Sequence, residues 1–383
     1  MAQDKALPVL PRRSKVVGAS RLLRMKAGHL LRGSAHPAPV GRPDYYTREL
    51  DSSLFIRNAT GLPIRSFTIP GQAEPNPRDL AAACHSRFGV YPLNFSFPSQ
   101  QVQSAPLAPR DHFLSTTYPG APHSFSNWED YLDEYRSSYF ALSTRKGGWD
   151  TFRHLEILFC GAIPLMPRLG QSHPYALAHY PKGLVSSILD SLVTQGPAIP
   201  DDETREFLSQ WAEYHLTTKA MASYVVDMAA MDTDRVVFID RSLASRTDYL
   251  SAFTFIGLSE VLGPRLIAAF EPSYLFDDFA GDTSRFYGKG FGYTKSIPRA
   301  LKSRESLSSD APAQDLVELA ESASAIVIGN YDANRDVVGD LLHAGIPPSK
   351  IVCVLGSDLP PDRALLRDIR RSEMTFFVRE FSS

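Results

Sequence analysis

Cysteine is scarce in this chain: only Cys84, Cys160 and Cys353 occur among 383 residues. They lie far apart and lack the spacing of metal ligands, so a disulfide framework or a cysteine metal site is not expected. A reducing, cytoplasmic compartment fits this usage. Apolar runs are also short, and none approaches the roughly 20 residues that a transmembrane helix needs.

The chain also lacks an excess of charge, since its formal net charge is -2. Nothing in that balance suggests nucleic acid as a partner. A hydrophobic content of 43% is that of a soluble globular protein. Because single cores stop growing beyond about 250 to 300 residues, this length predicts two domains.

The N-terminus has no acidic residue over positions 5–43, whereas nine Lys or Arg occur there. One interpretation is a basic amphipathic helix over 15–32 that makes a peripheral contact with an anionic membrane. A transit peptide has a similar composition, and a docked helix with a solvated basic side is the third interpretation. Residues 33–39 read as a linker, so 1–42 is expected to be a separate segment.

The most informative segment follows the expected strand 139–143. Gly147 and Gly148 allow close approach of the backbone to a ligand, and Asp150 or Thr151 is placed to cap a helix that opens at Phe152. A helix N-terminus behind a glycine pair favours a phosphate or pyrophosphate. The basic side chains beside this loop are Arg145 and Lys146.

Two charged residues of this helix, Arg153 and Glu156, lie three positions apart and share one face. Such a pair suits a nucleotide, with the guanidinium on the diphosphate and the carboxylate on ribose hydroxyls. A surface ion pair on an ordinary crossover helix is the alternative. The helix is expected to end at Gly161, before a buried strand over 163–166.

The remaining pattern alternates strands and helices, which predicts an α/β protein with two Rossmann-like domains, over 43–230 and 235–383. Before the glycine loop, strands are expected over 54–57, 64–70 and 112–115 and helices over 78–84 and 128–136, with 71–110 otherwise irregular. Residues 183–226 are expected to be helical. The second domain is expected to contain strands over 235–240, 265–270, 325–330 and 351–356 and helices over 248–262 and 334–343.

Residues Gly148 to Pro164 resemble the nucleotide-sugar half of GT-B glycosyltransferases, particularly exostosin-like enzymes and bacterial relatives of the spore-coat CgeB type. The shared pattern is G-x-D-[ST]-x-R-x-x-E, followed by a small-residue helix end and I-P. The resemblance implies a glycosyltransferase that binds a nucleotide diphosphate sugar. The binding residues it implies are Arg145, Lys146, Gly147, Gly148, Asp150, Thr151, Arg153 and Glu156.

In the resembling enzymes the donor domain is C-terminal, whereas here the donor-like half comes first. Residues 235–383 resemble their acceptor domain, so the chain reads as a circularly permuted GT-B enzyme. A six-residue echo between 45–50 and 376–381 is consistent with permutation. The resemblance further implies transfer without a metal or another cofactor to a glycan, lipid-linked or protein acceptor.

The catalytic groups are less sharply defined. Arg153 is expected to stabilise the departing diphosphate. An inverting reaction needs a general base, for which Asp240, Asp248 and Asp332 are candidates, while Asp248 also suits the N-cap of the helix it precedes. The glycine-rich stretch 287–293 reads equally as a loop that closes over the sugar and as a tight connection.

Two other function classes compete with the transferase. A binding protein or inactive scaffold would keep the GT-B shape without turnover. A dinucleotide-dependent oxidoreductase is disfavoured, because the strand at 236–240 is followed by Arg-Ser-Leu-Ala-Ser and not by G-x-G-x-x-G.

Overall fold

The computed structural model describes residues 65–67, 74–103, 109–117 and 125–382. Predictions for 1–64, including the basic segment 1–42 and the echo at 45–50, lie outside the described residues. The chain divides into two compact units, each built from segments that are separate in sequence. Their described parts are 65–67, 74, 103, 109–117, 125–172 and 181–212 for unit 1, and 75–102, 173–180 and 213–382 for unit 2.

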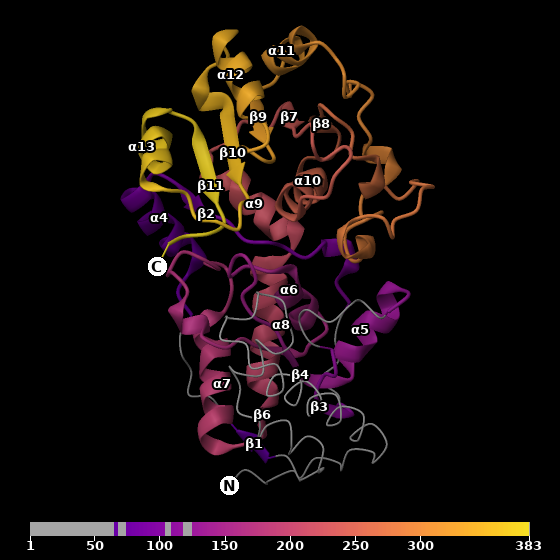
Figure 1. The fold of residues 1–383 in the computed structure, drawn as a ribbon, viewed down its shortest axis with the longest axis vertical. Helices are drawn as coiled ribbons and strands as arrows, with labels where there is room; N and C mark the ends of the chain where they lie inside the picture. The colour runs from indigo at the N-terminus through magenta and orange to yellow at the C-terminus, as the bar shows by residue number, and fades with distance from the viewer. Residues whose placement is uncertain (1–64, 68–73, 104–108, 118–124, 383) are drawn as a thin grey trace, which may run out of the picture. The chain divides into compact units, whose positions relative to one another are not determined.

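Unit 2 contains a six-stranded, entirely parallel sheet (Figure 1). The strand order is β2-β11-β10-β9-β7-β8. From β7 the chain first adds β8 on one side and then crosses to β9, β10 and β11 on the other, as in doubly wound sheets. The strands are β2 (Tyr91–Pro92), β7 (Val236–Ile239), β8 (Leu266–Ala268), β9 (Ala325–Ile328), β10 (Ile351–Leu355) and β11 (Thr375–Val378).

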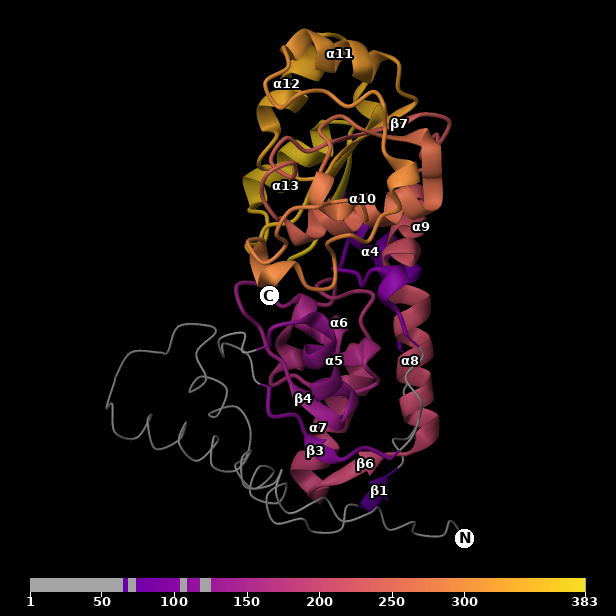
Figure 2. The same cartoon turned by 90° about the vertical axis from the view of Figure 1, so that its right-hand side faces the viewer.

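Helices cover both faces of this sheet. Val237 and Ile239 belong to a buried core that also contains residues of α4, α11, α12 and α13. Phe238 points to the opposite face, where its ring centroid is 5.1 Å from that of Phe255 in α10. Figure 2 shows α13 and α10 on opposite sides of the strands. The helices of unit 2 are α4 (Pro77–Phe88), α9 (Thr218–Met228), α10 (Tyr249–Leu262), α11 (Ala313–Glu321), α12 (Arg335–His343) and α13 (Arg363–Arg371).

Unit 1 is built around smaller parallel sheets. One has the order β3-β4-β5, and β1 pairs with β6 in the other. The strands are β1 (Arg65–Phe67), β3 (His112–Leu114), β4 (Ser138–Leu142), β5 (Ile163–Leu165) and β6 (Ala198–Pro200). The helices are α5 (Trp128–Arg136), α6 (Phe152–Phe159), α7 (Lys182–Gln195) and α8 (Asp202–Leu216), the last of which is shared with unit 2. β4, α6 and β5 form the predicted strand–helix–strand unit.

The α/β class and most elements agree with the sequence prediction. The predicted helix over 128–136 is α5 with the same bounds, and the predicted second-domain strands are β7, β8, β9 and β10. The prediction of continuous helix over 183–226 was wrong, because β6 and two helix breaks interrupt it. Pro197 and Pro200 lack the N–H groups that a continuous helix requires there.

The irregular excursion predicted for 71–110 also needs correction. Its helix α4 has twelve residues, and the Asn76 side chain accepts a hydrogen bond from the Arg78 backbone N–H at 2.9 Å. β2 then joins the large sheet by pairing Tyr91 with Phe377 of β11. The four strands predicted for this sheet omitted β2 and β11. A two-residue strand such as β2 is too short to show a periodic pattern, and the segment of β11 was considered only for its echo of 45–50.

Candidate functional site

The predicted glycine loop begins where β4 ends in unit 1. The Ser143 backbone N–H donates to the Leu165 carbonyl at 3.0 Å, which ties the start of the loop to β5. Within the loop, the Lys146 N–H donates to the Gly148 carbonyl at 3.1 Å. Gly147 is exposed, whereas Gly148 is buried. The loop therefore lies at the carboxyl ends of parallel strands, the position at which such sheets bind ligands.

The two basic side chains of this loop differ in their exposure to solvent. Arg145 is exposed, and its guanidinium carbon lies 5.5 Å from the centroid of the Trp149 ring. Lys146 is half-buried. The cation–π contact supports the Arg145 side chain on the loop surface while its N–H donors stay accessible to solvent.

His154, which the sequence analysis did not select, holds this loop. Its Nε2 lies 2.8 Å from the Trp149 carbonyl, and its Nδ1 lies 2.6 Å from the Ser143 hydroxyl. A carbonyl oxygen only accepts, so Nε2 carries the proton and Nδ1 accepts from Ser143. Burial lowers the pKa of His154 to about 4, with the nearby charge of Arg153 acting in the same direction. A neutral histidine thus joins the two ends of the loop.

The N-cap prediction for α6 is right in position and wrong in contact. Thr151 occupies the N-cap with extended backbone, but its own side chain makes no capping hydrogen bond to this helix. The Thr151 hydroxyl instead lies 3.4 and 3.3 Å from the two ring nitrogens of His154. Asp150, the other candidate cap, is buried.

Arg153 and Glu156 share a face of α6, as predicted, and that face meets two tyrosines of α5. Nη1 of Arg153 donates to the Tyr135 hydroxyl at 2.7 Å. The Tyr131 hydroxyl donates to Oε2 of Glu156 at 2.7 Å, and the two tyrosine hydroxyls are 3.1 Å apart. The surface ion pair considered as an alternative does not describe this arrangement, since Glu156 is buried. Spacing of Tyr131 and Tyr135 at i and i+4 was the sequence signal for this cluster.

The surroundings raise the pKa of both Arg153 and Glu156. For Arg153, burial acts to lower the pKa, but Tyr131, Tyr135 and Glu156 raise it above its usual range. Burial raises the pKa of Glu156, and Arg153 and the hydrogen bond from Tyr131 offset this only in part. The guanidinium is not saturated, because its Nε is buried without a hydrogen-bond partner among the described residues. The start of α6 therefore carries a cation with spare donor capacity.

The comparable position in unit 2 is the switch point between β7 and β9. Asp240 follows β7 and is buried. It accepts from the Ser242 hydroxyl at 2.7 Å, the Ser251 hydroxyl at 2.6 Å and the Asn334 amide at 3.1 Å. A further bond comes from the Ser242 backbone N–H at 3.0 Å. Asp240 therefore ties the loop after β7 to α10 and α12.

Asp248 caps α10, the alternative that its position before the helix suggested. Its Oδ1 accepts from the Ser251 backbone N–H at 3.0 Å, and its Oδ2 accepts from the Asn330 amide at 2.8 Å. Burial raises the pKa of Asp248, while these two hydrogen bonds act to lower it. Asp332, the third candidate base, pairs with Arg335 at 2.6 Å.

The stretch 287–293 has the geometry of a tight, aromatic-anchored connection. Gly288 and Gly290 have φ values of 61° and 73°, a region that glycine adopts without strain. The buried Tyr293 donates its hydroxyl hydrogen to the Tyr287 carbonyl at 2.9 Å. The alternative of a loop that closes over a sugar stays a prediction.

The chain contains one Asp-x-Asp sequence, a pattern of carboxylates that could ligate a metal, at Asp232–Thr233–Asp234. The Asp232 carboxylate accepts from the Asp234 backbone N–H at 3.1 Å, ahead of the amino end of β7. This is the opposite end of the strands from the ligand-binding edge. Within the described part of the chain, no group of three or more His, Cys, Asp or Glu side chains could hold a metal ion.

No protein-family model matches this chain, and neither a curated protein nor a solved structure matches it. The resemblance to GT-B enzymes therefore rests on the residues quoted for it. None of the helices in the described ranges has the length and apolar character needed to cross a membrane.

Proposed function

We propose that this protein is a GT-B glycosyltransferase with permuted domain order, which moves a sugar from a nucleotide diphosphate sugar to a glycan, lipid-linked or protein acceptor. In this proposal the donor site lies in unit 1, within residues 43–230, and the acceptor side is formed by residues 235–383 of unit 2. Transfer proceeds without a metal, and the basic N-terminus contacts a membrane surface at which the acceptor is presented.

The observation that carries the proposal is the spare hydrogen-bonding capacity of Arg153. Its guanidinium lies in the first turn of α6, behind an exposed glycine loop, and its buried Nε has no partner among the described residues. Leaving a buried donor unmatched costs about 1 to 3 kcal/mol, so the site is suited to a ligand that brings acceptor oxygens. A diphosphate supplies such oxygens and the charge that a helix N-terminus favours.

Within this site the other residues take distinct roles. Arg145 contacts the diphosphate from the loop surface, and Lys146 adds positive charge. The backbone of Gly147 and Gly148 forms the wall of the phosphate site. Glu156, oriented by Tyr131, accepts from ribose hydroxyls through the oxygen that Tyr131 does not occupy.

For the general base, the hydrogen bonds favour Asp248 over Asp240. Asp240 accepts four hydrogen bonds from protein groups, which occupy its carboxylate oxygens. Asp248 accepts two, and burial raises its pKa, a direction that suits a general base.

The first test is calorimetric titration of the full chain with UDP, GDP, dTDP, CMP and NAD. We expect selective binding of one nucleoside diphosphate. Arg145→Ala should weaken that binding about tenfold, the effect of losing one charged contact of about 1.4 kcal/mol, with little change in Tm because Arg145 is exposed. Arg299→Ala, an equally exposed arginine in unit 2, is the matched control and should bind normally.

Other outcomes would redirect the proposal. Binding of NAD alone would indicate an oxidoreductase. Binding of none of the five would favour the inactive scaffold, which already has one specific observation on its side: the carboxylates of Asp240 and Glu156 both serve internal hydrogen bonds. Nucleotide binding without hydrolysis of any corresponding nucleotide sugar would also favour the scaffold.

A further inference from the structure

Two buried arginines of unit 1, Arg110 and Arg205, contact the same tyrosine of β4. The Arg110 backbone N–H donates to the Tyr139 hydroxyl at 3.1 Å, and the guanidinium carbon of Arg205 lies 5.3 Å from the centroid of the Tyr139 ring. Tyr139 is itself buried and is the second residue of β4. This group, called the arginine site below, therefore lies at the amino end of the strand, whereas the glycine loop follows the carboxyl end.

Arg110 is a buried cation that forms no ion pair with a carboxylate of the described residues. Burial and the neighbouring charge of Arg205 lower its pKa to about 10. Its Nε is buried and has no hydrogen-bond partner in the described part of the chain, which is rare for a buried N–H group. The Nη1 atom, by contrast, donates around the C-terminal ends of α5 and α6, to the carbonyl oxygens of Tyr135, Arg136, Ser138 and Cys160.

Arg205, near the N-terminus of α8, also has a donor to spare. Its Nη1 pairs with Asp202 at 3.1 Å, but the Asp202 side chain is 76% exposed, so water screens that charge. Its Nη2 is buried and, within the described ranges, lacks a hydrogen-bond partner. One solvated carboxylate thus stands against two guanidinium charges, and the arginine site is positively charged.

We propose that the arginine site binds the phosphate group of a small ligand. Phosphate oxygens accept from Nε of Arg110 and from Nη2 of Arg205, and the Tyr139 hydroxyl donates to a further oxygen while it accepts from the Arg110 backbone. The negative charge is also favoured by the nearby N-terminus of α8. A phosphate therefore matches both the unpartnered donors and the charge of the site.

The arginine site is separate from the proposed donor site. Tyr139 and Ser143, which begins the glycine loop, are roughly 13 Å apart along an extended strand. The arginine site also shares no residue with the donor contacts proposed above. The two proposals can therefore fail independently, although both sites lie in unit 1.

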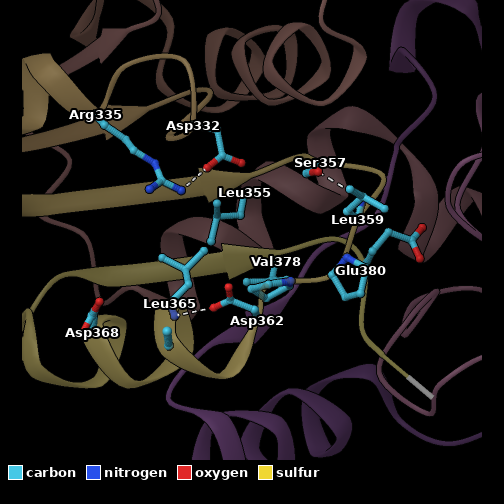
Figure 3. Close-up of a pocket in the computed structure, with 13 residues that line it drawn as sticks. Asp332, Arg335, Leu355, Ser357, Leu359, Asp362, Leu365, Asp368, Val378 and Glu380 are labelled. Carbon is cyan, nitrogen blue, oxygen red and sulfur yellow. Dashed lines mark hydrogen bonds and ion pairs between the residues drawn. The ribbon is translucent and has the colours of Figure 1, made fainter.

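The probe is inorganic phosphate, titrated calorimetrically into the full chain at constant ionic strength. Arg205→Gln should weaken its binding about tenfold, because a charged contact is lost. Arg335→Gln is the matched control and should bind normally. Arg335 likewise pairs with an aspartate three residues before it, as Figure 3 shows, and its guanidinium carbon lies 5.2 Å from the centroid of the Tyr331 ring. Unlike Arg205, it is exposed and belongs to unit 2.

A second variant keeps the test valid if Arg205→Gln does not fold. Tyr139→Phe removes only a hydroxyl and should weaken phosphate binding about threefold. Phosphate should also raise the melting temperature followed by tryptophan fluorescence, because all three tryptophans lie in unit 1. Glycerol 1-phosphate, titrated in parallel, distinguishes the sources of the phosphate group: tighter binding than that of inorganic phosphate assigns an ester, and weaker binding assigns the free ion.

Arg145→Ala separates the arginine site from the donor site. Phosphate binding at the arginine site should persist in this variant, in which nucleotide binding is weakened. Phosphate binding that is lost in Arg145→Ala but unchanged in Arg205→Gln would place the anion at the glycine loop and overturn the proposal. Absence of phosphate binding to the unaltered chain, or an equal loss in Arg335→Gln, would also overturn it.

Discussion

Both units place polar residues at the carboxyl ends of parallel strands. They differ in how many hydrogen-bonding groups remain available there for a ligand. In unit 1 the Arg153 guanidinium keeps a buried N–H without a partner among the described residues. In unit 2 the Asp240 carboxylate accepts four hydrogen bonds from its own surroundings. The edge in unit 1 therefore retains a hydrogen-bond donor for a ligand. At the switch point in unit 2, the carboxylate oxygens instead accept hydrogen bonds that hold the surrounding loops and helices together.

This difference shows that topology locates an edge but does not assign its chemistry. Asp240 fits the position of a catalytic carboxylate by sequence, yet its contacts are those of a structural anchor. Within the described part of the chain, the Arg153 guanidinium donates to one tyrosine hydroxyl, so it remains the better ligand group. Which polar groups at an edge already have hydrogen-bond partners distinguishes binding residues from structural ones better than the order of the strands does.

The largest loss of stability is expected when the Asp240 carboxylate, which anchors the loop after β7 in unit 2, is removed. Asp240→Ala leaves the Ser251 hydroxyl and the Asn334 amide without their acceptor in a buried site, and should destabilise unit 2 by about 4 kcal/mol. All three tryptophans lie in unit 1, so the loss should appear in far-UV circular dichroism melting and leave the tryptophan fluorescence transition in place.

Asp340→Ala, an exposed carboxylate of α12, is the control for Asp240. If both variants melt like the unaltered chain, Asp240 is not an anchor, and its role as a general base regains weight.

A smaller effect is expected on the pH dependence of stability, to which His154 contributes. Its pKa is lowered to about 4 in the folded chain, against about 6.5 when unfolded, so the unfolded state binds more protons between these values. Stability is therefore fully present above pH 6.5 and is lost as pH falls towards 4, by roughly 3 kcal/mol. His154→Gln should flatten this part of the profile, measured by urea unfolding followed through tryptophan fluorescence.

His343→Gln, in which an exposed histidine of unit 2 is replaced, should keep the full pH dependence. A separate acid-sensitive contribution is expected from His179 in unit 2, whose pKa burial lowers to about 3. An unchanged fluorescence profile in His154→Gln would show that His154 is not what ties the glycine loop to α6 at neutral pH.

The smallest expected effect probes the tyrosine cluster of unit 1. Tyr131→Phe removes the hydroxyl that donates to Glu156, and should cost about 1 kcal/mol of unit 1 stability. Tyr214→Phe is the control, because Tyr214 is 78% exposed. A Tyr131 variant as stable as the control would mean that Glu156 finds another donor and is free to rotate towards a ligand.

The local pattern of the sequence predicted much of the fold. Buried apolar runs such as 236–239 and the capped pattern of α10 identify their elements without tertiary information. The glycine loop between β4 and α6 was also predicted, because its residues act through local backbone geometry.

The sequence by itself determined an α/β chain with a glycine loop leading into a helix, since periodicity and turn residues are local properties. Only the tertiary structure decided that β2 joins the large sheet and that His154 holds the loop. It also decided that two tyrosines orient Arg153 and Glu156, and that the Asp240 carboxylate accepts hydrogen bonds from its own surroundings. These outcomes depend on residues distant in sequence, such as Asn334 and Asp240, which meet only when parallel strands bring their carboxyl ends to one edge.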